Sequence, residues 1–430
     1  MSQTHYQWIR EHGKRMDSSL RTSLIQRLHI LRYIPCLLHR SSLSFLNRMT
    51  QVPVLVQVDQ NSVSSQFEHS LQNMYSPVDY FRSIHTFKMK LNLTQLHKMM
   101  NLSEVKKVYL DRKVYALLDT ASSTVNAPMG WSHENTGEKA GIAIIDTGVH
   151  PHPDLMKPNS RIIAFKDFVK GKTKPYDDNG HGTHCAGCAA GNGYSSEGKY
   201  KGPAPGAKIV GVKVLGKTGS GNLSDVIAAM EWCIANQQTY NIRVISLSLG
   251  SQTNDSYQDD PVAQIAEKAW DSGMIVVAAA GNDGPEPRTI SSPGIHPQII
   301  TVGAIDDKKT TNKNDDSIAP FSSRGPTPDG ITKPDIVAPG SNITSLRVAR
   351  SYIDKMSPDS RMNRHYTTLS GTSMATPIVA GMAAVLLTQH PDWSPNEVKQ
   401  ALIRSAKSLQ LPSNTQGAGI AQMHSNWFKE

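Results

Sequence analysis

The spacing of hydrophobic positions along the chain changes near residue 120. Beyond it, short runs of β-branched and small residues alternate with stretches whose apolar residues recur at helical spacing. The apolar runs are IAIID (142–146), KIVGVKV (208–214), RVISLSL (243–249), MIVVAAA (274–280) and IITVGAI (299–305). Buried strands alternating with helices imply a parallel sheet covered on both faces. The pattern therefore predicts an α/β domain with a doubly wound, mostly parallel sheet.

The amphipathic stretches between these runs carry helix-end signals. Residues 224–238 begin at Ser224, a predicted N-cap, and residues 261–273 end on glycine. A later stretch starts at Ser394, with proline next and Glu397 three positions on, which is the pattern of a capping box.

A different pattern precedes residue 120. Residues 53–118 read as β-α-β-α-β with room for a hairpin, which suits a small ferredoxin-like α+β unit. Residues 1–50 are basic and mostly helical in pattern. The sequence thus predicts an N-terminal extension over 1–50, a small domain over 51–118 and a large domain over 119–430.

The formal net charge of +9 is concentrated near the N-terminus. Residues 1–50 hold eight Lys and Arg against two Asp and Glu, whereas residues 121–430 hold 29 against 28. The large domain is nearly neutral, so its composition predicts no nucleic-acid partner.

The chain carries no signal for a membrane or for export. It has no 18 consecutive apolar residues, so no membrane span is predicted. The apolar stretch 24–38 is interrupted by Arg27, His29 and Arg32, and no small-residue cleavage site follows it. Four irregularly spaced cysteines fit free thiols in a reducing compartment, so we expect a cytoplasmic protein.

The stretch LSGTSMATP (369–377) sets Ser373 after a glycine and before an apolar helical run. Ser373 could cap the helix with its side-chain oxygen. It could also be a nucleophile, because the N–H groups and dipole at a helix N-terminus favour an anion formed beside it. The second interpretation requires a base and an orienting acid elsewhere in the chain.

Three motifs offer such partners. Asp146 ends a buried strand at the edge where open α/β sheets place their sites, or it is a strand-end turn residue. His181 lies between two glycines at a predicted helix start. Asn282 follows a run of alanines and is either a turn residue or an amide donor for an oxyanion. A second Asp-Thr-Gly, which an aspartic protease requires, does not occur in the sequence.

The histidine motif also allows a metal hypothesis. Zinc-ligand residue types occur together at His181, His184, Cys185 and Cys188. Four ligands so close together in one short helix seldom converge on one ion, and no second cluster completes the site. We therefore favour catalysis over zinc or redox chemistry here.

The order Asp146, His181, Ser373 is the order of the subtilisin triad. Six motifs over roughly residues 126–425 resemble those of the subtilisin-like serine proteases, the subtilase family. They are IAIIDTGVHPHPDL, HGTHCAG, GVKVLGKTGSGNLSDVIAAMEW, SLSLG, AAAGNDG and LSGTSMATP. The wider layout is similar to the intracellular AprX-type subtilases of bacilli.

The resemblance implies a subtilisin-like fold and a serine endopeptidase. Ser373 would be the nucleophile, His181 the general base and Asp146 its orienting acid, while Asn282 would join the Ser373 N–H in an oxyanion hole. A peptide substrate would add as a β-strand between two edge segments. The implied substrate-binding residues are Leu215, Gly216, Ser248, Leu249, Gly250, Ala279 and Gly281. These residues are mostly small, which implies broad specificity and a preference for a large apolar residue directly before the cleaved bond. The alternative is a catalytically silent subtilisin-like binding protein.

The resemblance further implies a self-processed zymogen. Residues 51–118 would be a propeptide that assists folding and then inhibits, released by a cut between about Val114 and Thr120. The expected partners are protein and peptide substrates and this propeptide. No cofactor is needed for the chemistry. A structural calcium ion is left open, because Asp154 matches a calcium-ligating position while residues 191–205 do not read like the family's calcium loop. Residues 346–366 are longer than expected, and the sequence suggests no role for them.

Overall fold

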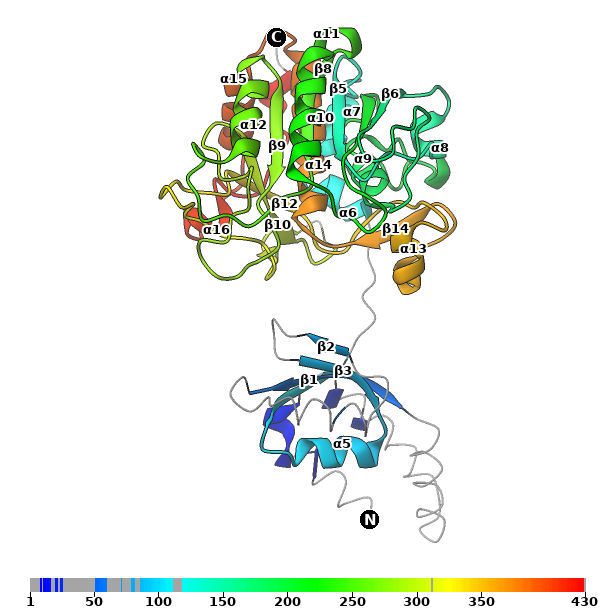
Figure 1. The fold of residues 1–430 in the computed structure, drawn as a ribbon, viewed down its shortest axis with the longest axis vertical. Coiled ribbons are helices and arrows are strands. Elements are labelled where there is room, and N and C mark those ends of the chain that lie inside the picture. The colour runs from blue at the N-terminus through cyan, green and yellow to red at the C-terminus, as the bar shows by residue number, and fades with distance from the viewer. Residues whose placement is uncertain are drawn as a thin grey trace. The chain divides into compact units, whose positions relative to one another are not determined.

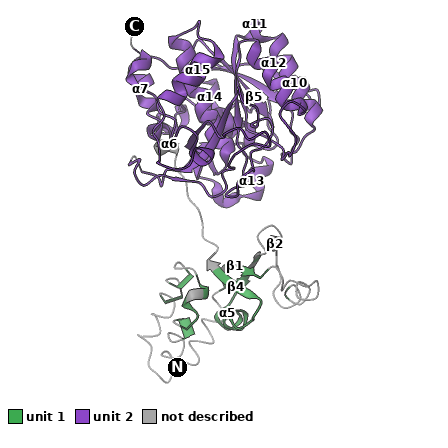
Figure 2. Cartoon of the chain, turned by 90° about the vertical axis from the view of Figure 1, so that its left-hand side faces the viewer, with its two compact units in different colours: residues 1–113 green, residues 114–430 purple. Residues whose placement is uncertain are grey.

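The chain forms two compact units. The computed structural model describes residues 8–9, 11–16, 20–21, 24–25, 51–59, 71, 79–81, 86–110, 118–310 and 312–428. The units span residues 1–113 and 114–430 (Figure 2). The division therefore falls between residues 113 and 114, whereas the sequence analysis placed it after residue 118.

The first unit is built on a four-stranded antiparallel sheet in the order β2-β3-β1-β4. Its elements are η1 (Gly13–Arg15), β1 (Val52–Val58), β2 (Asp79–Phe81), β3 (Thr86–Leu91), α5 (Leu93–Met100) and β4 (Val105–Leu110). The first helix of the predicted β-α-β-α-β pattern falls between β1 and β2, where residues 60–78 lie outside the described residues apart from Leu71. The ferredoxin-like assignment therefore stays a prediction.

Apolar positions of the first 25 residues belong to the core of this unit. Trp8, Met16 and Leu24 are buried in one cluster with strand residues such as Val54. Met16 also forms a parallel bridge with Val108 on β4. The described part of residues 1–50 is therefore packed with the sheet, whereas the sequence analysis treated it as a separate extension.

The second unit contains an eight-stranded sheet, a two-stranded hairpin and helices on both faces of the large sheet. The strands are β5 (Gly141–Asp146), β6 (Ile162–Asp167), β7 (Lys208–Lys213), β8 (Ile242–Leu247), β9 (Ile275–Ala279), β10 (Ile300–Asp306), β11 (Ser317–Ile318), β12 (Ile336–Pro339), β13 (Ile343–Leu346) and β14 (Tyr366–Leu369). The helices are α6 (Leu118–Thr124), α7 (Ala127–Ser132), α8 (Pro153–Met156), α9 (His181–Ala190), η6 (Tyr194–Ser196), α10 (Leu223–Ala235), α11 (Gln237–Tyr240), α12 (Pro261–Asp271), α13 (Tyr352–Met356), η7 (Pro358–Ser360), α14 (Thr372–Gln389), α15 (Pro395–Arg404), α16 (Ser413–Gln416) and η8 (Ser425–Phe428).

The large sheet is mostly parallel. Its order is β11-β10-β9-β8-β5-β7-β6, with β12 also paired to β10, and β11 is its antiparallel strand. Helices α10 and α12 pack together on one face, and α9 and α14 pack together on the other (Figure 1). This arrangement confirms the predicted doubly wound α/β fold.

Helix α14 is the central core helix. It is apolar on all sides, which is typical of a helix surrounded by protein. Its length and hydropathy would also suit a membrane span, but 89% of the relevant window is buried inside the fold. A Cβ at Gly381 would lie 2.6 Å from the Ala189 carbonyl oxygen, so glycine permits the close packing of α14 on α9.

The helix-end predictions had mixed outcomes. The capping box at Ser394 and Glu397 is confirmed. The N-cap assigned to Ser224 is wrong, because α10 begins at Leu223 and its cap is Asn222, which has extended backbone dihedrals.

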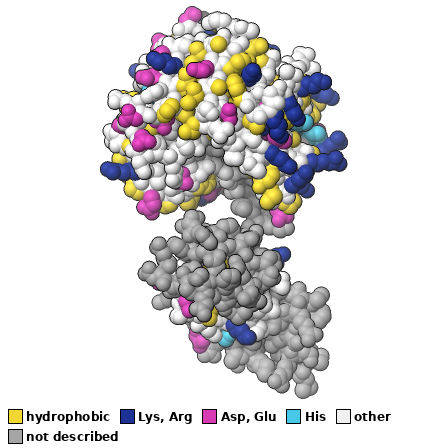
Figure 3. Space-filling model, in the orientation of Figure 1, with side chains coloured by type: hydrophobic (Ala, Val, Ile, Leu, Met, Phe, Trp, Pro, Cys, Tyr) yellow, Lys and Arg dark blue, Asp and Glu magenta, His cyan; other side chains and the backbone are white. Residues whose placement is uncertain are grey.

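Surface charge is unevenly distributed on the second unit. On the face in Figure 3, Lys and Arg side chains gather along the edge that carries β6 and α8 in Figure 1. The exposed lysines that follow β6 include Lys170, Lys172 and Lys174. The near-zero charge of residues 121–430 therefore conceals a locally basic edge.

Candidate active site

The site is built around a contact between Asp146 and His181. Asp146 is the last residue of β5, and His181 is the first residue of α9. His181 Nδ1 lies 2.8 Å from Oδ1 and 2.9 Å from Oδ2 of Asp146. The Asp146 side chain is fully buried, whereas the imidazole is 21% exposed. A buried carboxylate therefore holds one imidazole nitrogen while the ring keeps access to solvent.

Glycines allow α9 to begin this close to the strand end. Gly180 has φ of +105°, a left-handed conformation that favours glycine. A Cβ at Gly182 would lie 2.3 Å from the Gly148 carbonyl oxygen and 3.0 Å from Asp146 Cβ. Glycine is therefore required on both sides of His181, at Gly180 by the positive φ and at Gly182 by the close approach of the Gly148 carbonyl oxygen.

Asp177 holds the turn before His181, and the sequence analysis missed it. It is 4% exposed, and its Oδ1 accepts hydrogen bonds from Gly180 N at 2.8 Å and Thr147 Oγ1 at 3.0 Å. Its Oδ2 accepts from Thr183 N at 2.9 Å and Thr183 Oγ1 at 2.7 Å. An aspartate three residues before a glycine is a recognisable turn signal that could have identified it.

The electrostatics of the pair favour a protonated imidazole. Burial acts to lower the pKa of His181, but the adjacent Asp146 carboxylate outweighs this effect, and the pKa is raised well above 6.5. Cys185 Sγ lies 3.8 Å from His181 Nδ1, and burial raises the pKa of this thiol. Cys185 is therefore a neutral neighbour of the pair.

Ser373 does not act as the N-cap of α14. The cap is Gly371, and Ser373 is the second residue of the helix. Ser373 Oγ donates to the Ser248 carbonyl oxygen at 3.1 Å, and Ser248 Oγ donates to the Ser373 carbonyl oxygen at 2.8 Å. The Ser373 hydroxyl is thus held at the helix N-terminus without bonding an N–H group of the first turn.

Asn282 lies against the same helix start. Its Oδ1 accepts from Thr372 N at 2.8 Å and Thr372 Oγ1 at 3.1 Å, which directs Nδ2 away from that contact. A Cβ at Gly371, which has φ of +152°, would lie 3.4 Å from Asn282 Nδ2 and 3.7 Å from Ser373 N. Two N–H donors therefore border the space beside Gly371, where the positive φ favours glycine.

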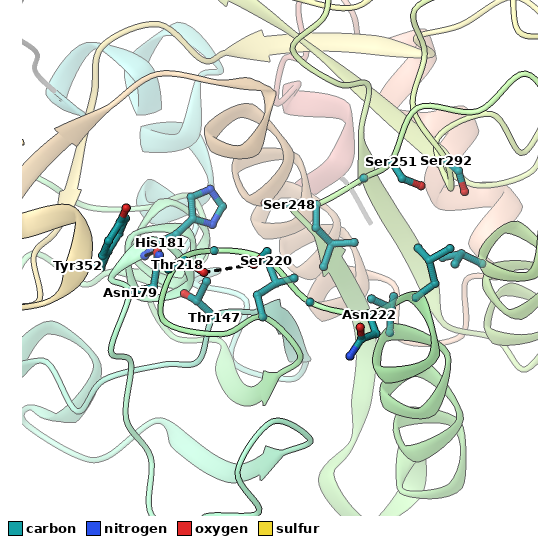
Figure 4. Close-up of a pocket in the computed structure, with 18 of the residues that line it drawn as sticks. Thr147, Asn179, His181, Thr218, Ser220, Asn222, Ser248, Ser251, Ser292 and Tyr352 are labelled. Carbon is teal, nitrogen blue, oxygen red and sulfur yellow. Dashed lines mark hydrogen bonds between the residues drawn. The ribbon is translucent and has the colours of Figure 1, made fainter. Parts of the chain in front are cut away.

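A cleft of about 530 Å³ begins beside His181. Its walls include four of the predicted substrate-binding residues, namely Leu215, Ser248, Leu249 and Gly250. Figure 4 shows His181, Asn179 and Tyr352 at one end of the cleft, with Ser251 and Ser292 toward the other.

Three predicted substrate-binding residues lie outside the lining of this cleft. Gly216 closes a tight turn, with its N–H donating to the Ser220 carbonyl oxygen at 2.8 Å. Ala279 is buried at the end of β9, and Gly281 N donates to Thr372 Oγ1 at 3.3 Å. Conversely, the sequence analysis missed Tyr352 and Ile353, which line the cleft from the segment to which it assigned no role.

The zinc hypothesis does not fit the structure. His184 is fully buried, and its Nε2 lies 3.0 Å from the Ile343 carbonyl oxygen. Within the described part of the chain, the one metal-ligand group that converges is Asp146, His181 and Cys185. His184 and Cys188 are not part of it, so the four predicted ligands do not surround one ion.

The side chain of Asp154, the residue that matches a calcium-ligating position, is held by hydrogen bonds. Calcium prefers six to eight oxygen ligands. Asp154 Oδ1 instead accepts from Ser195 N at 2.9 Å, and Oδ2 accepts from Tyr366 OH at 2.6 Å. The Arg161 guanidinium donates to the Asp154 carbonyl oxygen. Both carboxylate oxygens of Asp154 thus have donors within the protein, and the calcium site stays a prediction.

Comparison with known proteins identifies relatives over most of the chain. Residues 137–419 match the model of the subtilase family. The chain is 44% identical to serine protease AprX of Bacillus subtilis over 96% of both chains. It is 32% identical to a thermostable alkaline protease of Halalkalibacterium halodurans, over 84% of this chain and 88% of the relative.

Two solved structures resemble about two thirds of the chain. Sphericase is 31% identical with a TM-score of 0.55, and the psychrophilic protease S41 is 32% identical with a TM-score of 0.57. Each match covers 67% of this chain and 93% of the solved chain.

Proposed function

The chain belongs to the subtilase family and is a serine protease, and we propose that Ser373, His181 and Asp146 form its catalytic triad. The contact of His181 Nδ1 with both carboxylate oxygens of Asp146 carries this proposal. It holds the proton on Nδ1, which leaves Nε2 as the base, and it stabilises the imidazolium that forms.

The reaction proceeds through an acyl-enzyme. Ser373 Oγ attacks the scissile carbonyl carbon while its proton passes to His181 Nε2. The tetrahedral intermediate collapses as Nε2 returns the proton to the leaving amine, and water repeats the sequence to release the acid. The Ser373 hydroxyl donates to the Ser248 carbonyl oxygen, so it must rotate toward His181 before it can react. Catalytic hydrogen bonds often tighten only when substrate is bound.

Asn282 Nδ2 and Ser373 N hold the oxyanion in this proposal. Both donors border the space beside Gly371, and the Asn282 amide is oriented by Thr372. A positioned donor acts most strongly on charge that develops in the transition state. In this proposal the N-terminus of α14 stabilises the anion that forms beside Ser373. This explains why a serine lies between Gly371 and the apolar part of the helix.

The chemistry is tested by active-site labelling. A fluorophosphonate should label the wild type at Ser373, and Ser373→Ala should lose both labelling and casein cleavage while remaining folded. Ser405→Ala, at the end of α15, is the control and should behave as wild type. Labelling of Ser373→Ala would contradict the triad, and a wild type without labelling or cleavage would favour the silent binding protein.

We infer broad endopeptidase specificity with a large apolar residue before the cut. Ser248 and Gly250 are small wall residues, and Leu215, Val226 and Val262 add apolar surface to the cleft. Backbone hydrogen bonds to an added strand supply sequence-independent affinity. A peptide-library cleavage profile measures this preference directly.

We also propose that the first unit is an inhibitory propeptide removed by self-cleavage. Its support is the separation of the chain into two compact units. The expected cut lies between about Val114 and Thr120, and residues 114–117 of this range are outside the described residues. Mass spectrometry should find a shortened N-terminus in the wild type and a full-length chain in Ser373→Ala. A full-length, fully active wild type would contradict it.

We propose a cytoplasmic location, with protein and peptide substrates as partners beside the propeptide. Cys185, Cys188 and Cys233 are free buried thiols, which suits a reducing compartment. Fractionation of producing cells tests this, and recovery of the protein mainly from the medium would contradict it.

A further inference from the structure

The segment that joins β13 to β14, residues 347–365, is an ordered structure rather than an open loop. β13 and β14 pair as an antiparallel hairpin from Ile343 and Leu369 to Leu346 and Tyr366. Hairpin connections usually have two to five residues. This one contains α13 and η7 and leads, through β14, to the helix start that carries Ser373.

Asp354 holds the segment together. Its side chain is 4% exposed, and Oδ1 accepts from Arg347 Nε at 2.6 Å and Arg361 Nε at 2.8 Å. Its Oδ2 accepts from Arg350 N at 2.8 Å. Burial would raise the pKa of Asp354, but these donors lower it to about 2. The carboxylate is therefore charged, and it ties α13 to Arg347 and Arg350 before the helix and to Arg361 after it.

The start of α13 is docked on the residues that precede His181. Tyr352 N donates to the Asp178 carbonyl oxygen at 3.0 Å, and Ile353 N donates to the Asn179 carbonyl oxygen at 3.0 Å. Asn179 Oδ1 in turn accepts from His181 N at 3.1 Å, and its Nδ2 donates to the Lys217 carbonyl oxygen at 2.8 Å. Two backbone bonds thus fix Tyr352 relative to the imidazole and to the opposite side of the cleft.

Tyr352 and Ile353 line the same cleft as His181 and Leu215. Figure 4 shows Tyr352 beside His181 at one end of it. Side chains of an extended peptide alternate between the two sides of its backbone. If the residue that supplies the scissile carbonyl faces the wall at Ser248–Gly250, the preceding residue faces the opposite side. Figure 4 shows His181 and Tyr352 close together and apart from Ser248, and Leu215 belongs to the same lining.

We propose that Tyr352 is a specificity-determining residue for the second substrate residue before the scissile bond, and that it selects a large apolar or aromatic side chain there. Such a side chain would be buried between the tyrosine ring and Leu215, and burial of apolar surface favours it over glycine or alanine. A charged side chain would lose its hydration at the same place. This inference rests on the proposed protease function.

The test is a series of peptides that differ only at this second position, carrying Phe, Leu, Ala, Gly or Asp. Wild type should show the highest kcat/KM with Phe and Leu. Tyr352→Ala should reduce the ratio of kcat/KM for the Phe peptide to that for the Gly peptide about tenfold, which is the scale expected when part of one pocket contact is lost. The change should appear mainly in KM. Tyr352→Phe should retain the ratio, because the ring remains.

Two controls separate specificity from a structural role. Met356→Ala changes a 65% exposed side chain on the same helix, and should leave all rates unchanged. A second series of peptides varies only the residue directly before the cut. Tyr352→Ala should rank these peptides by kcat/KM in the same order as wild type. An unchanged Phe-to-Gly ratio, or an equal loss on every peptide in both series, would overturn the proposal. A wild type that cleaves no peptide would instead overturn the protease function itself.

Discussion

Asn282 Oδ1 accepts a hydrogen bond from the backbone N–H of Thr372 at 2.8 Å, one residue before Ser373. The same oxygen accepts from the Thr372 hydroxyl at 3.1 Å. Because both bonds use the amide oxygen, the amide nitrogen is left to face the space beside Gly371. Asn282, which follows β9 by three residues, is thereby oriented by the helix that carries Ser373, the serine it assists in the proposed mechanism.

Replacing Asn282 tests this orientation. Asn282→Leu should lower kcat by about 10²–10³-fold with little change in KM, which is the usual cost of losing one oxyanion donor. Steady-state kinetics on a peptide substrate measure both constants. Asn426→Leu, at an exposed position, is the control. An unchanged kcat would mean that Asn282 is only a turn residue.

The pH profile tests the state of His181. The base must be neutral, and its pKa lies well above 6.5 because the Asp146 carboxylate outweighs burial. As pH falls through that pKa, the imidazole takes up a proton and the base is lost. The acidic limb of kcat/KM should therefore have its midpoint above pH 6.5, with melting temperatures recorded to confirm folding. A midpoint below pH 6.5 would refute the assignment.

Cys185 should make the enzyme sensitive to organomercurials without taking part in the chemistry. Its Sγ lies 3.8 Å from His181 Nδ1 and donates to the Ser373 carbonyl oxygen at 3.4 Å, so a bound mercury atom must displace the imidazole. Cys185→Ala should remain active and become resistant, whereas Cys233→Ala should stay sensitive. Inactivity of Cys185→Ala, or sensitivity equal to wild type, would contradict this role.

Asp316 should reduce stability at neutral pH. Both carboxylate oxygens are buried without a hydrogen-bond partner among the described residues. Burial, reinforced by Asp307 and Asp315, raises its pKa to about 6. Because the folded-state pKa exceeds the ordinary 3.8, the penalty is full above pH 6 and disappears below about pH 4.

Asp316→Asn should accordingly raise the melting temperature at pH 8 by roughly 2–4 °C, equivalent to about 1 kcal/mol in a domain of this size. The difference from wild type should vanish at pH 4. Asp392→Asn, at an exposed position, should produce no such pH-dependent difference. A melting temperature at pH 8 equal to or below that of wild type would disprove the penalty.

The sequence by itself determined the strand that ends at Asp146, the glycines around His181 and the serine at the start of α14. Each depends on local constraints, namely a fully buried run of residues, a left-handed or crowded backbone position, and a helix start. Such constraints act on neighbours in the chain, so they leave a readable pattern. The same locality explains why the capping box at Ser394 was predicted correctly.

The tertiary structure decided which distant segments support these residues. Thr372 orients Asn282, Asp177 holds the turn before His181 through Thr147 and Thr183, and α13 brings Tyr352 to the cleft. Apart from the contact between Asp177 and Thr183, these contacts join residues far apart in sequence. Their polar side chains would suit a solvent-exposed loop equally well. Only the packing of β5, α9 and α14 places them within hydrogen-bond distance, because a hydrogen bond depends on positions in space that no local pattern encodes.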